Sequence, residues 1–562
     1  MGLRLRTILA GDLRDIAAEF RHAWTVLRRR GPSKMQFWFI ALLLGIVAGF
    51  VTVGFRGAIN LLQSTLYGVD DPRKLHSFAE MLPWYWVLII PVIGGLVVGL
   101  ILNRYTDDGR VRSVADVIEG AALHDGRVER KAGLASALAS WITLSSGGST
   151  GREGPVVHLC ATISSWVSER LNADGITGRD LLGCAVAAAV AASFNAPIAG
   201  ALFALEVILR HFAVHAFAPI VIASVAGAVI SRLTFGNVTE FVVPAANSLV
   251  LYVELPAFLI LGLVCGLVAV VMMRSLFWAE TIGNHIQTET GLPRWLRPAI
   301  SGAMLGGLAI FFPHIIGVGY ETTSDALTGQ LGLREVLLFA VFKAVAVAIT
   351  FAGRMGGGVF SPALMLGALT GLAFGIIATS ALPDLSGSET LYALAGMGAV
   401  AAAVLGAPIS TTLIVFELTG DWQTGIAVMV AVSTSTALST RLVDRSFFLT
   451  QLERRDKHLA AGPQAYLLSL YKVAVVMRGK DSPGAASPEA CAALVELGLF
   501  LNPDSTLDQA MPIFEETGHS FIPVMQPESA DGEARLLGAL FHLDALSAYN
   551  RALAETAAEE HS

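Results

Sequence analysis

The sequence predicts an all-α polytopic membrane protein built from two repeats with broken helices, followed by a small α/β tail. Three observations support this fold class. Hydrophobic residues make up 54% and charged residues 15% of the 562-residue chain, whereas soluble domains carry about 25% charged residues. Motifs that contain glycine and proline recur in the same order in the two halves. The composition becomes polar and charged after about Gln451.

The apolar residues gather in long uncharged runs, each of which reaches or approaches the roughly 20 residues that span a bilayer as a helix. The runs cover Met35–Phe55, Leu181–Leu205, Phe212–Ser231, Pro256–Met273, Val359–Leu382 and Leu391–Phe416. A soluble core does not need so many. The run at Met35 starts too late and is too long for a signal peptide. The basic residues before it predict a cytoplasmic N-terminus.

We expect three parts: a basic cytoplasmic segment at 1–34, a membrane domain at 35–455 and a soluble cytoplasmic tail at 456–562. The two repeats cover about 37–235 and 251–443. An odd number of membrane crossings before the linker between them would invert the second repeat, and we infer this inverted arrangement. The chain is then a multi-pass protein of the cell (plasma or inner) membrane, with both termini in the cytoplasm.

Two pairs of motifs carry the repeat. Residues 151–155 and 358–362 both read Gly-x-x-x-Pro, at an offset of 207 residues. Downstream, Pro197 and Pro408 each follow an alanine and precede a glutamate by nine residues, at an offset of 211. Glycine and proline interruptions at matching positions of two halves predict discontinuous helices that meet near the middle of the bilayer.

The Gly-x-x-x-Pro motifs have the chemistry of an anion site. Pro155 and Pro362 each suit the first turn of a helix, where the missing N–H costs nothing. Glycines before them leave backbone N–H groups open, and a helix N-terminus carries about half a positive charge. The predicted anion-binding residues of these motifs are Gly151, Arg152, Glu153, Gly154, Gly358, Val359 and Phe360. The alternative is that the glycines only permit close helix packing.

Glu153 lies inside the first motif, and an ionisable residue at membrane depth predicts a function. Its carboxylate is stable at a helix N-terminus for the same reason as a small anion, so it can occupy the anion site and block it. Protonation or displacement by an anion would release it, which makes Glu153 a predicted gate. The alternative is an ordinary capping carboxylate. Phe360 stands at the matching position of the second repeat, so only one half supplies the gate.

The remaining residues predict structural roles, and the remaining motifs argue against a metal, cofactor or catalytic site. Glu206 and Glu417 end matching helices, and their twin placement predicts capping or pairing with backbone. The four cysteines are scattered without metal spacing, so we expect no metal site and no cofactor. No H-E-x-x-H, G-x-S-x-G or C-x-x-C motif occurs, and we expect no catalytic residue and no enzyme activity. A cation-coupled solute symporter is a distant alternative, because it would need paired carboxylates that are not evident.

At these motifs the chain resembles the CLC family of chloride channels and chloride/proton exchangers, over about residues 37–455. The resemblance rests on three stretches, residues 147–155, 195–206 and 356–362. It implies two inverted repeats with short, tilted helices, a homodimer with one pore per subunit, and chloride as the transported ligand. It also implies that Glu153 is the external gating glutamate and that backbone N–H groups around Val359 and Phe360 line the central anion site.

Three departures from the family pattern concern the pore. The usual Gly-Ser-Gly-Ile-Pro motif is absent, although Ser113 keeps a serine near that position. Phe448 stands where a pore tyrosine is usual, and it has no hydroxyl to donate. Val207 stands where exchangers of the family carry a second acid. Without that acid protons lack an internal landing point, which favours a passive, glutamate-gated anion channel; a chloride/proton antiporter is the alternative.

The tail weakly resembles a CBS module. Residues 501–507 lead into an expected helix, Phe521–Met525 and Leu537–Leu540 read as strands, and a helix should follow from His542. CBS modules work in pairs, and Lys457–Phe500 lacks the pattern of a first module. We therefore do not expect a nucleotide there, nor a nucleic-acid partner, and a cap that stabilises a dimer is the alternative.

Overall fold

The computed structural model of the protein describes residues 34–457 apart from 70, 213, 237–240, 242–250 and 384–385. It also describes 459, 468, 471–526 and 535–560. Nearly all of the predicted basic segment at 1–34 therefore lies outside the described residues, as does most of the linker between the repeats.

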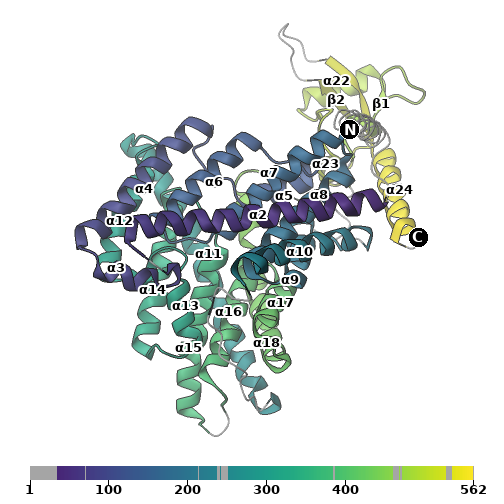
Figure 1. Cartoon of the computed structure of the whole chain (residues 1–562). Coiled ribbons are helices and arrows are strands. Elements are labelled where there is room, and N and C mark those ends of the chain that lie inside the picture. Colours follow the sequence, from purple (N-terminus) through teal and green to yellow (C-terminus); the bar gives the residue numbers. More distant parts are fainter. Residues whose placement is uncertain are drawn as a thin grey trace, which may run out of the picture.

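The first half of the membrane domain holds ten helices or helical turns among the described residues (Figure 1). They are α2 (Lys34–Tyr67), η1 (Pro72–Lys74), α3 (Leu75–Met81), α4 (Trp84–Tyr105), α5 (Val114–Leu123), α6 (Arg130–Ser145), α7 (Glu153–Leu171), α8 (Gly175–Phe194), α9 (Pro197–Phe203) with its π-helical extension η2 (Ala204–Leu209), and α10 (Val214–Phe235). The long α2 packs along α8 and α10.

The second half repeats this order. It comprises α11 (Leu251–Thr290), α12 (Arg297–Phe311), η3 (Pro313–Ile315), α13 (Tyr320–Leu327), α14 (Leu333–Ala352), α15 (Phe360–Ala381), α16 (Glu389–Leu405), α17 (Pro408–Thr419), α18 (Trp422–Leu442) and α19 (Phe447–Glu453). Eight helices of the described chain are long and apolar enough to cross a membrane, so the expectation of a multi-pass, all-α membrane domain is confirmed.

Two of the apolar runs are broken where the motifs predict. Asn195 (φ 57°) ends α8 and Gly406 (φ 70°) ends α16, each in the left-handed conformation that stops a helix. Pro197 and Pro408 then start α9 and α17, because proline suits a first turn but not a helix interior. Each run therefore forms two helices with exposed backbone ends between them.

The two halves are joined by a reciprocal pair of helix caps. Glu206, in η2, accepts the backbone N–H groups of Ile409 and Ser410 at 2.9 and 2.8 Å, in the first turn of α17. Glu417, in α17, accepts two N–H groups in the first turn of α9 at 3.0 and 2.8 Å. Each half thus caps the other at the same place. The structural role predicted for both glutamates agrees with this geometry, and an exchange of this kind relates the repeats by a two-fold axis.

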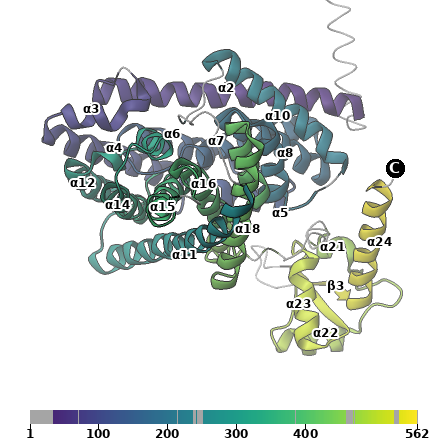
Figure 2. The ribbon, with the colours of Figure 1, turned by 90° about the horizontal axis from the view of Figure 1, so that it is seen from below.

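The tail is a small α/β unit, separate from the membrane helices in Figure 2. Its antiparallel sheet has the order β1-β3-β2, with β1 (Arg478–Gly479), β2 (Phe521–Gln526) and β3 (Arg535–Phe541). The helices are α21 (Val473–Val476), α22 (Pro488–Glu496), α23 (Leu507–Thr517) and α24 (His542–Glu560). The two strands and the two helices expected from the sequence are confirmed.

The reciprocal caps generate a prediction about stability. Glu206→Ala should lower the free energy of unfolding by about 1–3 kcal/mol, because two N–H groups in the first turn of α17, one of them part-buried, lose a charged acceptor. Glu417→Ala should have a similar effect. Thermal unfolding of the purified protein in detergent measures both. Glu335→Ala is the control, since its carboxylate caps the exposed N–H of Gly332 at 2.9 Å and water can replace it. A loss in the control as large as in the two variants would contradict the prediction.

Candidate functional site

The site is built where the loops before α7 and α15 cross. Gly151 and Gly358 exchange both backbone hydrogen bonds, each at 2.7 Å, in an antiparallel bridge. The Thr150 hydroxyl also donates to the Gly358 carbonyl at 2.9 Å. Gly357 adopts φ 142°, and a Cβ there would lie 2.0 Å from the Thr150 Oγ1. Only glycine fits this crossing, which brings the N-termini of two helices from opposite halves together.

Glu153 is the first residue of α7, and the residue is 2% exposed. Its Oε1 accepts a hydrogen bond from the Ser361 hydroxyl, in the first turn of α15, at 2.7 Å. A Cβ on Gly151 would lie 2.7 Å from the Glu153 Oε2 and 3.1 Å from the Ser361 backbone nitrogen. The carboxylate therefore sits beside the N-terminus of α15, where the open N–H groups and the helix dipole favour a negative charge.

One cavity of about 50 Å³ opens beside this crossing, and we call it the tail-side cavity because Arg455, which follows α19, lines it. Ser113, Val359 and Phe448 line it together, although they come from three distant segments. Ser113 precedes the first residue of α5, and its backbone N–H donates to Asp116 at 2.7 Å. Its hydroxyl oxygen lies 2.8 Å from where a Cβ on Gly154 would stand. Ser113 therefore lies at the tail-side cavity, beside Gly154.

A second cavity of about 200 Å³, the distal cavity, is lined by Arg152 and by the loop before α13. The Arg152 guanidinium carbon lies 5.2 Å from the ring centre of Tyr320, which is a cation–π distance. The buried Lys343 fixes the loop by donating to the carbonyls of Ile315, Gly317 and Val318 at 3.0–3.4 Å. Glu153 follows Arg152 and precedes Gly154, which contacts Ser113. Glu153 thus lies in the chain between a residue that lines the distal cavity and one that contacts Ser113 of the tail-side cavity.

The distal cavity also holds a histidine beside a carboxylate. His76 Nδ1 lies 3.1 Å from Glu321 Oε2, and Glu321 also accepts from the backbone of His76 and from Ser77. Burial lowers the pKa of His76 to about 4. At neutral pH the imidazole is therefore uncharged, and the positive charges at this cavity come from arginines.

The remaining predicted residues lie around the crossing. Phe360, the counterpart of Glu153, packs its ring 4.8 Å from Phe194 and 5.9 Å from Phe203. Val207 is buried in η2. Pro155 and Pro362 lie in the first turns of α7 and α15. The anion-binding and gating roles of these residues stay predictions, but most of them gather at the crossing or at the tail-side cavity.

Several residues at the site were not predicted to act there. Tyr320 matches Ser113 at the same offset of 207 residues, so the repeat itself could have found it. The sequence carries no comparable signal for Arg110 and Glu280, which line the tail-side cavity. Ser361 lies within a quoted motif, but its contact with Glu153 spans 208 residues of chain. Among the described residues, no group of three or more His, Cys, Asp or Glu could hold a metal ion.

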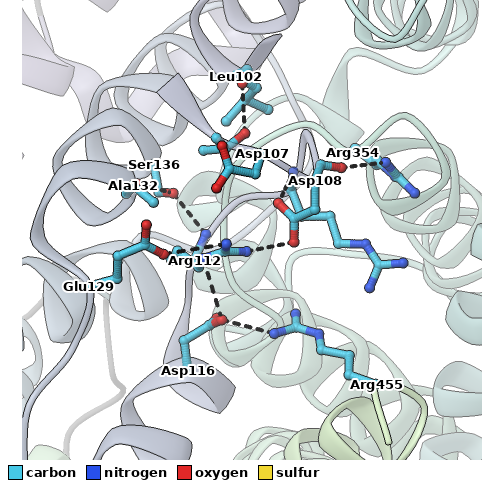
Figure 3. Close-up of polar contacts among 12 residues, drawn as sticks. Leu102, Asp107, Asp108, Arg112, Asp116, Glu129, Ala132, Ser136, Arg354 and Arg455 are labelled. Atoms are coloured by element: carbon cyan, nitrogen blue, oxygen red, sulfur yellow. Dashed lines mark hydrogen bonds and ion pairs between the residues drawn. The ribbon is translucent and has the colours of Figure 1, made fainter. Parts of the chain in front are cut away.

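Charged residues form a network beside the tail-side cavity (Figure 3). Arg112 bonds Asp108 at 2.8 Å and lies 3.5 Å from Glu129. Arg455 donates to Asp116 at 2.8 Å. Asp116 also holds the backbone of Ser113. The network therefore ties the end of the membrane domain to the start of α5.

Comparison with known proteins gives a consistent result. A family model described as "Voltage gated chloride channel" matches residues 94–440. A protein of Ralstonia nicotianae described as ClcB-like is 32% identical over 429 residues, which cover 75% of this chain and 98% of that protein. The voltage-gated ClC-type chloride channel ClcB of Escherichia coli is 29% identical over 72% of this chain and 95% of its own length. The crystal structure of a slow cyanobacterial Cl⁻/H⁺ antiporter shares the fold, with a TM-score of 0.67 at 20% identity over 75% of this chain and 98% of that one.

The crossing of the two loops can be tested at Gly357. Gly357→Ala should lower the free energy of unfolding by about 3 kcal/mol or prevent folding, because it adds backbone strain and a clash with Thr150. Thermal unfolding and size-exclusion behaviour in detergent measure the effect. Gly307→Ala in α12 is the control, because its Cβ would meet open space and alanine favours a helix. Equal stability of the two variants would contradict the close approach of Gly357 to Thr150.

Proposed function

The chain belongs to the voltage gated chloride channel (CLC) family, and we propose that it conducts chloride passively through a pathway gated by Glu153. CLC-type anion transport across a membrane follows from the family. The passive, glutamate-gated form is the proposal, and one observation supports it above the others. The Glu153 carboxylate is buried and accepts a hydrogen bond from Ser361 at the start of α15, and its chain neighbours are Arg152, which lines the distal cavity, and Gly154, which contacts Ser113.

A carboxylate in this position competes with the transported anion. Helix N-terminal N–H groups stabilise a dehydrated chloride and a carboxylate by the same partial charges. Neither needs a fixed cation, which would hold the anion too firmly for conduction. Protonation of Glu153 removes its charge, and chloride can then take the place beside α15. Ser113, Gly151, Arg152, Gly154, Gly358, Val359, Phe360 and Phe448 are the residues that we assign to the anion path.

The passive form is favoured by the residue next to Glu206. Val207 is buried and cannot bind a proton, so a proton released by Glu153 has no acid there on the way to the other side. A residue without a titratable group supports anion flow that is not coupled to protons.

A chloride/proton antiporter is the second candidate, and Glu280 favours it. This carboxylate, in α11, is among the residues that line the tail-side cavity, so it could receive protons that Val207 cannot. The solved relative with the same fold is described as a Cl⁻/H⁺ antiporter. Proton flux therefore decides between the two forms.

We further propose a homodimer in the cell (plasma or inner) membrane, with one pathway per subunit. Both termini and the tail-side cavity would face the cytoplasm. The basic residues at 1–34 and the arginines at the tail-side cavity agree with the excess of positive charge on the cytoplasmic side of membrane proteins.

The deciding experiment is chloride efflux from liposomes that contain the purified protein, with external pH recorded. The passive form predicts that chloride leaves only when a potassium ionophore balances charge, while the pH stays flat. Chloride efflux that drives protons inward before a proton ionophore is added would show an antiporter, and Glu280→Gln should then abolish the coupling. No chloride movement under either condition would contradict both forms.

Glu153→Ala should leave the pathway open. Its efflux rate at neutral pH should exceed that of the wild type by about tenfold or more, because a charge-assisted contact no longer holds the blocked state. Wild-type efflux should rise on acidification, and the variant should lose this pH dependence. Glu169→Ala, at the other end of α7, removes a carboxylate away from the site and should behave as the wild type. A variant no faster than the wild type would place the gate elsewhere.

A further inference from the structure

Three arginines from distant segments line the tail-side cavity together. Arg110 follows α4, Arg354 lies between α14 and α15, and Arg455 follows α19. Figure 3 shows Arg354 beside Asp108 and Arg455 beside Asp116. The cavity also contains Ser113 and Val359. These two residues stand at the N-termini of α5 and α15, whose dipoles add partial positive charge.

The hydrogen bonds of these guanidinium groups are incomplete. Arg354 donates to the Asp108 carbonyl at 3.0 Å and to Asn284 at 3.1 Å, and Arg455 donates to Asp116. In the part of the chain that the structure describes, the Nε–H groups of Arg110, Arg354 and Arg455 are all buried and have no acceptor. Buried donors of this kind nearly always have one, so three at one small cavity point to a ligand that accepts hydrogen bonds.

Positive charge predominates among the residues that line the cavity. Within the described residues, no carboxylate lies within ion-pair distance of Arg110 or Arg354, and Arg455 shares Asp116 with Arg112. Arg354 is close enough to Arg110 for their charges to repel each other, although Glu280 and Asp108 lie close enough to attract it. Glu280 is the acidic residue among those that line the cavity, and it offsets one positive charge of the three.

Arg354 is also held in an unfavourable backbone conformation. Its φ is 55°, in the left-handed region that residues with a side chain rarely adopt. Such outliers persist only where the surrounding structure enforces them, and they gather at functional sites. Here the backbone places a guanidinium group between α14 and α15, six residues before the first residue of α15.

We propose that Arg110, Arg354 and Arg455 form an anion-binding site of side chains in the tail-side cavity, separate from the position that Glu153 occupies. Its ligand is a single small inorganic anion of the transported class, such as chloride or nitrate. The cavity of about 50 Å³ suits one such ion and is too small for a nucleotide. The choice of ligand rests on the proposed function, but the site itself rests on the arginines.

The site would act as a loading position for the pathway. It concentrates anions at one mouth, beside Ser113 and beneath the start of α15. It also supplies donors on the side where Phe448 has no hydroxyl. Since the guanidinium groups hold only the mouth, an anion can leave toward the helix N-termini without a fixed cation deep in the membrane.

The first test uses Arg110→Gln, because no side-chain hydrogen bond of Arg110 supports the fold in the described residues. The half-saturating chloride concentration of efflux from liposomes should rise about tenfold, the value of one charge-assisted contact. Arg110→Lys keeps the charge and should recover part of the affinity. Arg294→Gln is the matched control: this exposed arginine donates to the Asp107 carbonyl and does not line the cavity. Its effect should be about twofold or less, because solvent screens exposed charge.

A second measurement does not depend on transport. Bromide soaked into crystals of the full chain should give an anomalous peak among the three arginines, and Arg110→Gln should remove that peak. A cavity without bromide in the wild type would overturn the proposal, and so would equal shifts for Arg110→Gln and Arg294→Gln. If the peak is present but wild-type liposomes release no chloride, the anion site stands and the proposed transport function fails.

Discussion

The structure depends on one crossing, the pair of backbone hydrogen bonds between Gly151 and Gly358. It holds the starts of α7 and α15 at the same place, although these helices belong to opposite halves of the chain. Two helix N-termini that meet inside a membrane leave several N–H groups without intrahelical partners. An apolar surrounding makes such groups expensive to leave unpaired. The crossing therefore favours a negative charge at the two helix N-termini.

Glu153 supplies this negative charge with its carboxylate. Its carboxylate is buried at the start of α15, where the Ser361 hydroxyl donates to it. Glu206 and Glu417 make the same kind of contact, because their carboxylates accept backbone N–H groups at the starts of α17 and α9. In the proposed mechanism the same type of group therefore serves as a fixed cap in one place and as a displaceable blocker in the other. The two capping carboxylates occupy matching positions of the two repeats, whereas the position that matches Glu153 in the second repeat holds Phe360.

The asymmetry of the repeats extends to both mouths of the pathway. Ser113 and Tyr320 occupy equivalent positions, but Ser113 lines the small tail-side cavity and Tyr320 the larger distal cavity. Arginines stand at both mouths, while the crossing itself contains no lysine and only the arginine next to Glu153. Full positive charge is thus placed at the two cavities and largely kept away from the crossing. At the crossing the positive charge is mostly the partial charge of helix N-termini, since a full charge would hold an ion too firmly.

The sequence by itself determined the membrane class, the two repeats, the broken helices and the motif that contains Glu153. These features follow from composition and from residues close together in the chain, such as Asn195 before Pro197. Only the tertiary structure decided what each motif touches. Ser361 beside Glu153, the exchange of caps between Glu206 and Glu417, and the meeting of Arg110 with Arg354 and Arg455 join residues about 200 or more positions apart, or on unrelated loops. Local patterns do not encode such pairs, because they arise from how the second repeat folds back against the first. The position of Ser113 is the clearest case: the motif around it has changed, yet packing against Gly154 keeps it at the pathway.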